Sequence, residues 1–439
     1  MRNDDGLGRG IAYHAGMTSS RRRRAILIVC DGLGAEWIDA ERTPALVRLQ
    51  AAHRSAGDHR AVFPSVTRVS AASIATGCHP ARHGLEGNQM ALFEDGRLAV
   101  HNVGAPTFRQ TMRQATGQTL RVPTLAERLV SCGGQVAYSN VSPGAAYFLD
   151  PDHFGTVLHR AGSFAPGGAA LTGAAHLAVT HDLAGDIEMT RRFCAEIVPS
   201  ETQALAVLWL ANPDLTSHHE PLGSPEHLHA LKVTDGLVSE VLDAVRAHED
   251  RFDTLVLVGS DHGHETVGRS VHLGRWLSDN GLEAELRHGR IAVASQGTCA
   301  LIYATEKARA ALGEVLPRMH TEPWAGAILT GEALAATGLS GTMLVAAVDT
   351  ARHDERNGYG VAGTRWLVED GEGPPEIGCG HHGGLGPQET RPFLVLAHAD
   401  FGQGRIARTT SLVDIAPTIL DFLGQPADRL DGAAIAARR

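Results

Sequence analysis

Long hydrophobic runs bounded by polar residues recur along the chain, and they predict buried strands. Residues 25–30, 204–211 and 254–259 are apolar at almost every position, which is typical of parallel strands covered on both faces of a sheet. Helical patterns lie between these runs. Strands that alternate with helices predict a doubly wound α/β core built on a mostly parallel sheet.

Polar residues at defined positions mark where several helices begin. Capping patterns open the segments that start at Thr124, Ser224 and Ser411, and we expect helices from there to about residues 132, 248 and 423. Residues 141–186 carry no clear pattern. The other expected elements are helices at 43–52, 186–198 and 305–316, strands at 135–140, 298–303 and 393–397, and a hairpin around Asp95-Gly96.

The pattern changes between residues 267 and 377, where shorter helices and strands follow one another. This change predicts an α+β cap subdomain inserted into a core made of residues 25–266 and 378–432. Residues 1–24 are polar and glycine-rich and end in four arginines, so we expect a disordered basic tail, with Met1 or Met17 as the true start.

Composition narrows the class of protein. The 439 residues are 43% hydrophobic and carry a net charge of −10, which argues against a nucleic-acid polymer or an anionic membrane as partner. No apolar run approaches the roughly 20 residues of a membrane span. The six scattered cysteines contain no CxxC pair and favour reduced thiols in the cytoplasm. We recognise no signal peptide, although this does not exclude export.

One polar residue near a predicted helix start draws attention. The stretch from Phe63 to Gly77 reads as a loop that runs into a helix, so Thr67 falls near a helix N-terminus. Unpaired N–H groups and the helix dipole favour an anion such as phosphate at that place. A threonine there is ordinarily only a cap, and residues elsewhere in the chain must support a functional role.

Three aspartates follow the ends of predicted buried strands. Asp31, Asp214 and Asp261 each stand within three residues of such an end. In an open α/β sheet the ligand crevice lies outside the carboxyl ends of the strands, so these carboxylates should meet. Like charges at one edge repel one another unless cations lie between them.

Histidines complete a candidate metal centre. His218 follows Asp214 by four residues, His262 follows Asp261 directly, and His382 lies in a glycine-flanked loop. With the aspartates they offer enough nitrogen and oxygen ligands for two divalent ions. We expect structural or outer-shell roles for their nearest neighbours, which are His79, His83, His219, His264 and His381.

Two divalent ions in one crevice suit phosphoryl transfer, because one can activate a hydroxyl nucleophile and the other can stabilise the leaving oxygen. Thr67 would be that hydroxyl and would form a covalent phosphothreonine, which a water then releases. The chain contains no Walker loop, GxSxG elbow or GxGxxG fingerprint, so the sequence gives little support to nucleotide-driven motors, serine esterases or dehydrogenases.

Taken together, the motifs resemble the alkaline phosphatase superfamily, in its type I phosphodiesterase/nucleotide pyrophosphatase branch. The resemblance implies one metal held by Asp214, His218 and His382. It implies a second metal held by Asp31, Asp261, His262 and the nucleophile Thr67, with zinc at both positions, although the sequence does not exclude Mn²⁺. The matching pieces are Asp31-Gly, Pro64-x-x-Thr67, Thr76-Gly-x-x-Pro80-x-x-His83-Gly84, Asn88, Asp214-x-x-x-His218, Ser260-Asp-His-Gly263, Gly380-x-His382-Gly383 and the closing segment from Ser411 to Gly424.

The substrate side departs from the family pattern. Many of these phosphodiesterases carry Asn three residues after the nucleophile, where this chain has Ser70, and the residue after Thr67 is Arg68. Arg68, Ser70 and Asn88 are therefore the expected substrate contacts. Phosphonoacetate hydrolase, a close relative, cleaves a P–C bond in a substrate whose carboxylate needs a cation, which Arg68, Arg121 or Lys232 could supply.

These observations predict a two-metal hydrolase of small phosphorylated substrates, foremost a phosphodiesterase or nucleotide pyrophosphatase. A phosphonate hydrolase or phosphomonoesterase on the same site is the first alternative, and a metal-dependent phosphosugar mutase ranks lower. The non-enzyme alternative is a binding protein that kept the fold and lost catalysis. The oligomeric state stays open between monomer and homodimer.

Overall fold

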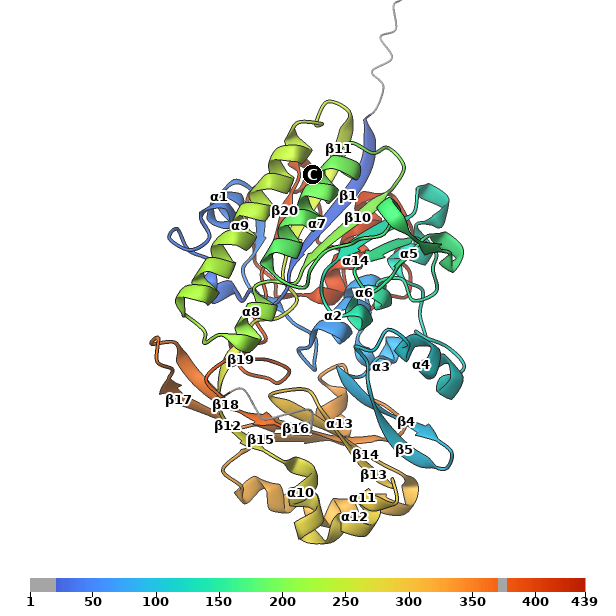
Figure 1. The fold of residues 1–439 in the computed structure, drawn as a ribbon, viewed down its shortest axis with the longest axis vertical. Coiled ribbons are helices and arrows are strands. Elements are labelled where there is room, and N and C mark those ends of the chain that lie inside the picture. Colours follow the sequence, from blue (N-terminus) through green and yellow to red (C-terminus); the bar gives the residue numbers. More distant parts are fainter. Residues whose placement is uncertain (1–20, 370–376, 439) are drawn as a thin grey trace, which may run out of the picture.

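The structure is a computed structural model, and it describes residues 21–369 and 377–438. A large sheet flanked by helices forms one half of the molecule, and two smaller sheets with short helices form the other half (Figure 1). The two halves meet where the central strands β1, β10 and β11 end.

The central sheet has ten strands, and its middle strands run parallel. In spatial order the strands are β21 (Gly404–Ile406), β2 (Arg54–Ala56), β20 (Leu394–Ala397), β11 (Phe252–Gly259), β1 (Arg22–Cys30), β10 (Leu205–Leu210), β6 (Gln135–Ser139), β7 (Thr156–His159), β8 (Ser163–Phe164) and β9 (Ala170–Leu171). Val29 of β1 pairs with Trp209 on one side and Gly259 on the other. Strand β20 joins β11 antiparallel. The predicted doubly wound, mostly parallel sheet is confirmed.

Helices cover both faces of this sheet, which explains its continuous apolar strands. Ile26 and Ile28 of β1 pack into the cluster on one face, and Leu27 and Val29 pack into the cluster on the other. The first face is covered by α1 (Pro44–Ala52), α7 (Leu183–Glu196) and α9 (Pro225–Arg246). The second face is covered by α2 (Thr67–Thr76), α5 (Leu125–Arg128), α6 (Pro143–Phe148) and α14 (Ile415–Phe422).

Strand β1 begins earlier than the sequence predicts. It starts at Arg22, so the last residues of the expected tail belong to the sheet. Arg24 is only 2% exposed, because its guanidinium stacks 3.6 Å from the ring centroid of Phe252 and donates to Thr254 Oγ1. Residues 1–20 lie outside the described part of the chain.

Most predicted helix starts and turns are confirmed. The Thr124 hydroxyl accepts from the Glu127 amide, and Ser411 with Asp414 forms a full capping box before α14. The helix at Thr124 is shorter than expected and ends at Arg128. The unassigned stretch 141–186 contains α6 and the short strands β7 to β9.

The second half of the molecule is built around two four-stranded sheets. One sheet consists of β17 (Arg352–Arg356), β18 (Ala362–Val368), β12 (Glu265–Val271) and β19 (Gly380–His381). The other consists of β13 (Ile291–Ser295), β14 (Cys299–Ala304), β16 (Leu344–Thr350) and β15 (Ala325–Thr330), with helices α10 (Leu273–Leu277), α11 (Glu283–Arg287), α12 (Glu306–Val315) and α13 (Gly331–Ala335).

An earlier part of the chain also packs on this half. The hairpin of β4 (Gln89–Glu94) and β5 (Arg97–Asn102) turns at Asp95-Gly96 as expected. Its Met90 and Leu98 share a core cluster with Leu301 of β14. The boundaries at 267 and 377 stay a prediction, and residues 370–376 lie outside the described chain.

The remaining elements are α3 (Pro80–His83), α4 (Phe108–Thr116), α8 (Asp214–His219), and the pair β3 (His59–Arg60) with β22 (Thr410–Ser411). The six cysteines form no disulfide with one another. Within the described residues, no helix combines the length and hydrophobicity needed to cross a lipid bilayer.

Candidate metal centre and active site

Three neighbouring strands deliver aspartates to one edge of the central sheet. Asp31 follows β1 directly, Asp261 follows β11 by two residues, and Asp214 opens helix α8 just after β10. Because β11, β1 and β10 lie side by side and run parallel, their carboxyl ends meet at the same edge. The structure therefore brings together the carboxylates that the sequence placed at strand ends.

Four of the expected ligands form a compact cluster, which we call the buried half: Asp31, Thr67, Asp261 and His262. His262 Nε2 lies 3.4 Å from Asp31 Oδ1 and 3.2 Å from Asp261 Oδ2. Thr67 Oγ1 lies 3.0 Å from His262 Nε2 and 3.5 Å from Asp31 Oδ1. Each of the four side chains is buried. All four face a common point at the start of α2.

The other three ligands form the open half: Asp214, His218 and His382. His218 Nε2 and His382 Nε2 both lie 3.4 Å from Asp214 Oδ1. The side chains of His218 and Asp214 are 26% and 16% exposed, so this half reaches solvent. The rings of His262 and His382 stack with centroids 3.6 Å apart, which places the two halves in contact.

The residues present fit divalent metal ions. Two ligand atoms about 2.0 Å from one tetrahedral ion lie about 3.3 Å apart, and the oxygen–nitrogen distances within both halves fall between 3.0 and 3.4 Å. Asp261 Oδ2 is buried and has no hydrogen-bond partner. An orphaned carboxylate oxygen beside an imidazole nitrogen is a donor pair that a cation would satisfy.

Electrostatics in the buried half favour a cation. Burial, together with the charge of Asp261, raises the pKa of Asp31 well above its usual range. Burial raises the pKa of Asp261 to about 7, and the charge of Asp214 adds to that shift. Burial lowers the pKa of His262 to about 3, so its ring is neutral and able to ligate a metal at neutral pH.

Asp214 in the open half behaves differently. Burial alone would raise its pKa, but the positive charges and hydrogen bonds of His218, with further contributions from His264 and His382, hold the pKa well below its usual range. Asp214 is therefore ionised whether or not a metal is bound.

Ser65 holds the loop that carries His382. The Ser65 carbonyl accepts from His382 Nδ1 at 2.8 Å, which leaves Nε2 to face Asp214. The Ser65 hydroxyl accepts from the Gly383 amide at 3.1 Å and donates to the Gly384 carbonyl at 2.9 Å. Because Ser65 lies two residues before Thr67, one residue ties the predicted nucleophile to a ligand of the open half. Sequence analysis missed this role, since its only signal is the position of Ser65 beside Pro64.

His381, which directly precedes His382 in the chain, makes different contacts. Its Nδ1 contacts the backbone of His382, and its ring lies against that of His218 with centroids 4.6 Å apart. His83 bonds Ser73 Oγ at 3.0 Å inside the core, which fits the structural role expected for it.

A cavity of about 170 Å³ opens onto both halves. Arg68 lines it and is held in place, because its Nε donates to Ser142 Oγ and its Nη1 donates to the Asn88 carbonyl. Asn88 also lines the cavity, and its Oδ1 accepts from the Arg68 amide. The wall also includes Ser142 and His181, which the sequence did not single out.

One expected substrate contact, Ser70, and one alternative cation, Arg121, lie outside this cavity. Ser70 is fully buried in the first turn of α2, and it is not among the residues that line the cavity. Arg121 lines a different cavity, beside Gly84. Of the cations considered for substrate binding, Arg68 is therefore the one that the structure places beside Thr67.

His264 was expected to play a structural or outer-shell part, and the structure places it against the metal ligands. Its Nε2 lies 2.9 Å from Asp214 Oδ1. The donor atoms of Asp214, His262, His264 and His382 all lie within 4.8 Å of one another. Spacing alone could not have found this contact, which joins residues 50 positions apart.

Comparison with known proteins agrees with this geometry. The family model described as type I phosphodiesterase / nucleotide pyrophosphatase matches residues 25–326. Murine ectonucleotide pyrophosphatase/phosphodiesterase 5, solved as an inactive variant in complex with AMP, has a TM-score of 0.68 at 14% identity, with 94% of this chain and 98% of that chain covered. The human protein of the same name gives 0.66 at 14% identity, with 94% and 97% covered.

A search of curated proteins found no match. The similarity to the solved structures concerns the fold, whereas the family model covers more than half of the chain. This chain belongs to the type I phosphodiesterase / nucleotide pyrophosphatase family, within the alkaline phosphatase superfamily, and is a hydrolase of phosphorus esters.

Proposed function

We propose that the protein is a two-zinc phosphodiesterase or nucleotide pyrophosphatase that acts through a covalent phosphothreonine at Thr67. The observation that carries this proposal is the position of the Thr67 hydroxyl, 3.0 Å from His262 Nε2 and beside Asp31, at the wall of a cavity that both halves share. The open half, with two imidazoles and one carboxylate, supports zinc over manganese, which prefers carboxylate and water ligands.

Two ions would be held by the buried half and the open half, where they would lower the pKa of the Thr67 hydroxyl and offset charge on the phosphoryl oxygens. Thr67 Oγ1 attacks phosphorus, and the alcohol or phosphate leaving group departs on the opposite side. The side-chain oxygen of Asn88 is engaged by the Arg68 amide, so its NH₂ group is the end available to a phosphoryl oxygen. Water then hydrolyses the phosphothreonine.

A second candidate is a hydrolase of small phosphonates, and the position of Arg68 favours it. The cavity of about 170 Å³ is smaller than the roughly 300 Å³ at which pockets for drug-sized ligands begin. The Arg68 guanidinium at its wall could bind a second anionic group of a small substrate, as a carboxylate would require. Phosphonoacetate is the probe for this reading.

The test combines metal analysis with parallel rate measurements. The substrates are bis-p-nitrophenyl phosphate, p-nitrophenyl phosphate, a nucleoside 5′-monophosphate p-nitrophenyl ester and phosphonoacetate. We expect two zinc ions per chain, a preference for the diesters, and a loss on the order of 10⁴-fold or more in kcat/KM for Thr67→Ala. Acid-quenched reactions should contain a phosphorylated Thr67 by mass spectrometry.

Thr76→Ala is the matched control, because Thr76 lies in the same helix and its hydroxyl bonds the Ala72 carbonyl and the Cys78 amide, away from the metal centre. It should keep the wild-type rate. A preference for phosphonoacetate that Arg68→Met abolishes would move the assignment to P–C cleavage. A metal-free protein with no Thr67-dependent turnover would overturn the proposal and favour the binding protein.

A further inference from the structure

His264 contacts both the buried half and the open half of the metal centre. Its Nε2 lies 2.9 Å from Asp214 Oδ1, and its Nδ1 lies 3.1 Å from the Gly32 carbonyl oxygen. Gly32 follows Asp31, and its amide donates to Asp261 Oδ1 at 3.1 Å. The ring is only 3% exposed. A single side chain thus contacts a ligand of the open half and the turn that carries the buried half.

The turn at Gly32 is shaped to receive this ring. Gly32 has a φ of +67°, and a Cβ placed there would lie 2.3 Å from His264 Cε1 and 2.9 Å from Asp214 Cβ. A side chain at residue 32 is therefore impossible while His264 and Asp214 keep their positions. The absence of a Cβ lets the imidazole lie directly against the backbone beside Asp31.

Distance separates His264 from the ligands around it. His218 Nε2 and His382 Nε2 lie 3.4 Å from Asp214 Oδ1, close to the roughly 3.3 Å edge of a tetrahedral ligand set. His264 Nε2 lies at 2.9 Å from the same oxygen, which is an ordinary hydrogen-bond distance. On this oxygen, the shorter contact of His264 favours a hydrogen bond from the ring over metal ligation.

We propose that His264 is a positioning residue for Asp214. It donates from Nε2 to Asp214 Oδ1, and its ring, packed against the Gly32 turn, keeps that carboxylate in fixed relation to Asp31. The inference rests on the proposed two-metal function and adds a part that the ligand motifs do not contain. Outer-shell partners of this kind typically change metal affinity by about 10- to 100-fold when they are removed.

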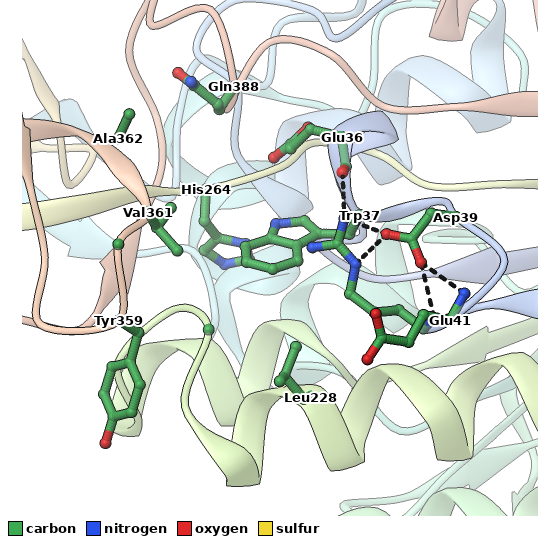
Figure 2. A pocket seen from close by; sticks show the side chains of 13 residues that line it. Glu36, Trp37, Asp39, Glu41, Leu228, His264, Tyr359, Val361, Ala362 and Gln388 are labelled. Atoms are coloured by element: carbon green, nitrogen blue, oxygen red, sulfur yellow. Dashed lines mark hydrogen bonds and ion pairs between the residues drawn. The ribbon is translucent and has the colours of Figure 1, made fainter.

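A second cavity beside His264 affects which substitution of this residue gives a clear result. His264 also lines a cavity of about 530 Å³ with Trp37 and Val361, at the boundary between the two halves of the molecule (Figure 2). Truncation to alanine would open the metal centre toward this cavity and admit water, so a loss of metal would have two explanations. Substitution of His264 by glutamine or asparagine avoids this problem. The side-chain amide of glutamine reaches the position of Nε2, whereas that of asparagine reaches only the position of Nδ1.

The experiment measures zinc affinity by chelator competition, with zinc content and circular dichroism recorded on each sample. For His264→Asn we expect one of the two zinc ions to bind about 10- to 100-fold more weakly and the other to change less than threefold. For His264→Gln we expect near-wild-type affinity, since an amide N–H can still donate to Asp214. His227→Asn is the control, because His227 is buried nearby, and its Nδ1 accepts from the Gly223 amide.

The possible outcomes distinguish a failure of the positioning role of His264 from a failure of the proposed two-metal function. If His264→Gln loses zinc as His264→Asn does, His264 is a metal ligand and the positioning role is wrong. If both variants bind two zinc ions as the wild type does, the inference fails while the two-metal function stands. If the wild type binds no zinc, the proposed function fails first. If His227→Asn weakens zinc as His264→Asn does, the effect belongs to the loss of a buried ring, and the inference is overturned.

Discussion

The buried half and the open half of the metal centre differ in what fixes their side chains and in what stabilises their carboxylate charges. The buried half stands on the ends of β1 and β11 and the start of α2, where the surrounding core fixes the side chains. Its carboxylates have raised pKa values, because burial and mutual repulsion disfavour their charges. In the open half, Asp214 has a lowered pKa, because histidines surround it. Without a cation the carboxylates of the buried half bear a desolvation penalty, whereas the histidines around Asp214 stabilise its ionised form.

The two halves also differ in what keeps them in place. His218 lies in the short helix α8, and His382 lies in a loop that Ser65 anchors through its carbonyl and its hydroxyl. Arg365 of β18 bonds Asp349 and Glu389, and the Glu389 carboxylate accepts from the Gly384 amide, which steadies the same loop. The buried half thus depends on the core, whereas the open half depends on contacts between distant loops.

The largest effect should come from neutralising the buried half. Asp261→Asn should lower kcat/KM on the order of 10³-fold, since removal of a metal ligand costs several kcal/mol of transition-state stabilisation. In metal-free protein at pH 8, the same variant should raise the free energy of unfolding by about 1–3 kcal/mol, because a buried negative charge whose Oδ2 has no hydrogen-bond partner disappears. Steady-state kinetics and urea unfolding with a chelator present measure the two effects.

Asp186→Asn is the control for that comparison. Asp186 is also buried, but its carboxylate accepts hydrogen bonds from Asn140 and from Ala211 and Asn212. The substitution should lower the free energy of unfolding, because an amide cannot accept all of these bonds. Equal destabilisation by both variants would show that the buried half is not strained.

An intermediate effect should follow from loosening the open half. Ser65→Ala removes the hydroxyl bonds to Gly383 and Gly384 but keeps the carbonyl bond to His382. We expect kcat/KM to fall about 10- to 100-fold and one zinc ion to bind more weakly, as for other outer-shell partners. Zinc titration with a competing chelator, run beside the kinetics, measures this.

Ser73→Ala provides the matched control, because Ser73 is equally buried in α2 and bonds His83 away from the metal centre. It should reduce stability without changing zinc affinity. If Ser65→Ala weakened both zinc ions equally, the two halves could not be treated as separately supported.

The smallest effect is a pH dependence. The folded pKa of Asp261 is raised to about 7, so the folded protein keeps a proton there that the unfolded chain releases near pH 3.9. The charged form therefore destabilises the metal-free wild type increasingly as pH rises from about 4 to about 7. The difference in unfolding free energy between Asp261→Asn and wild type should grow over that interval and then level off.

Titrations of histidines distant from Asp261 occur in both proteins and cancel in this difference, whereas Asp31, whose pKa the charge of Asp261 raises, contributes to it. Unfolding curves at several pH values with a chelator present supply the measurement. A difference that stays constant from pH 4 to 8 would mean that Asp261 titrates as it does in the unfolded chain.

The sequence was sufficient to predict features that depend on a local residue pattern or on the order of elements along the chain. Apolar runs identified β1, β10 and β11, and the aspartates after them were therefore expected at one edge of the sheet. The short strands β8 and β9 have two residues each, too few to show a periodicity. The hairpin β4–β5 was found, but its packing on β14 depends on contacts that no local pattern encodes.

The same limit applies within the site. Ligand identity follows from chemistry and spacing, whereas the contacts of Ser65 with residues 382–384 and of His264 with Asp214 span large distances along the chain. Ser70 was expected at the substrate because of a family pattern, and its fully buried side chain lies elsewhere. The cytoplasmic location, the small-molecule partner and the homodimer stay predictions.

The order of the ligands along the chain has a consequence for biosynthesis. The last residue of the buried half is His262, and the open half is completed only by His382, which is 382 − 262 = 120 residues later. At about 5–20 residues per second, a ribosome needs roughly 6–24 seconds for that interval. For that interval the nascent chain contains every residue of the buried half, and every residue of the open half except His382.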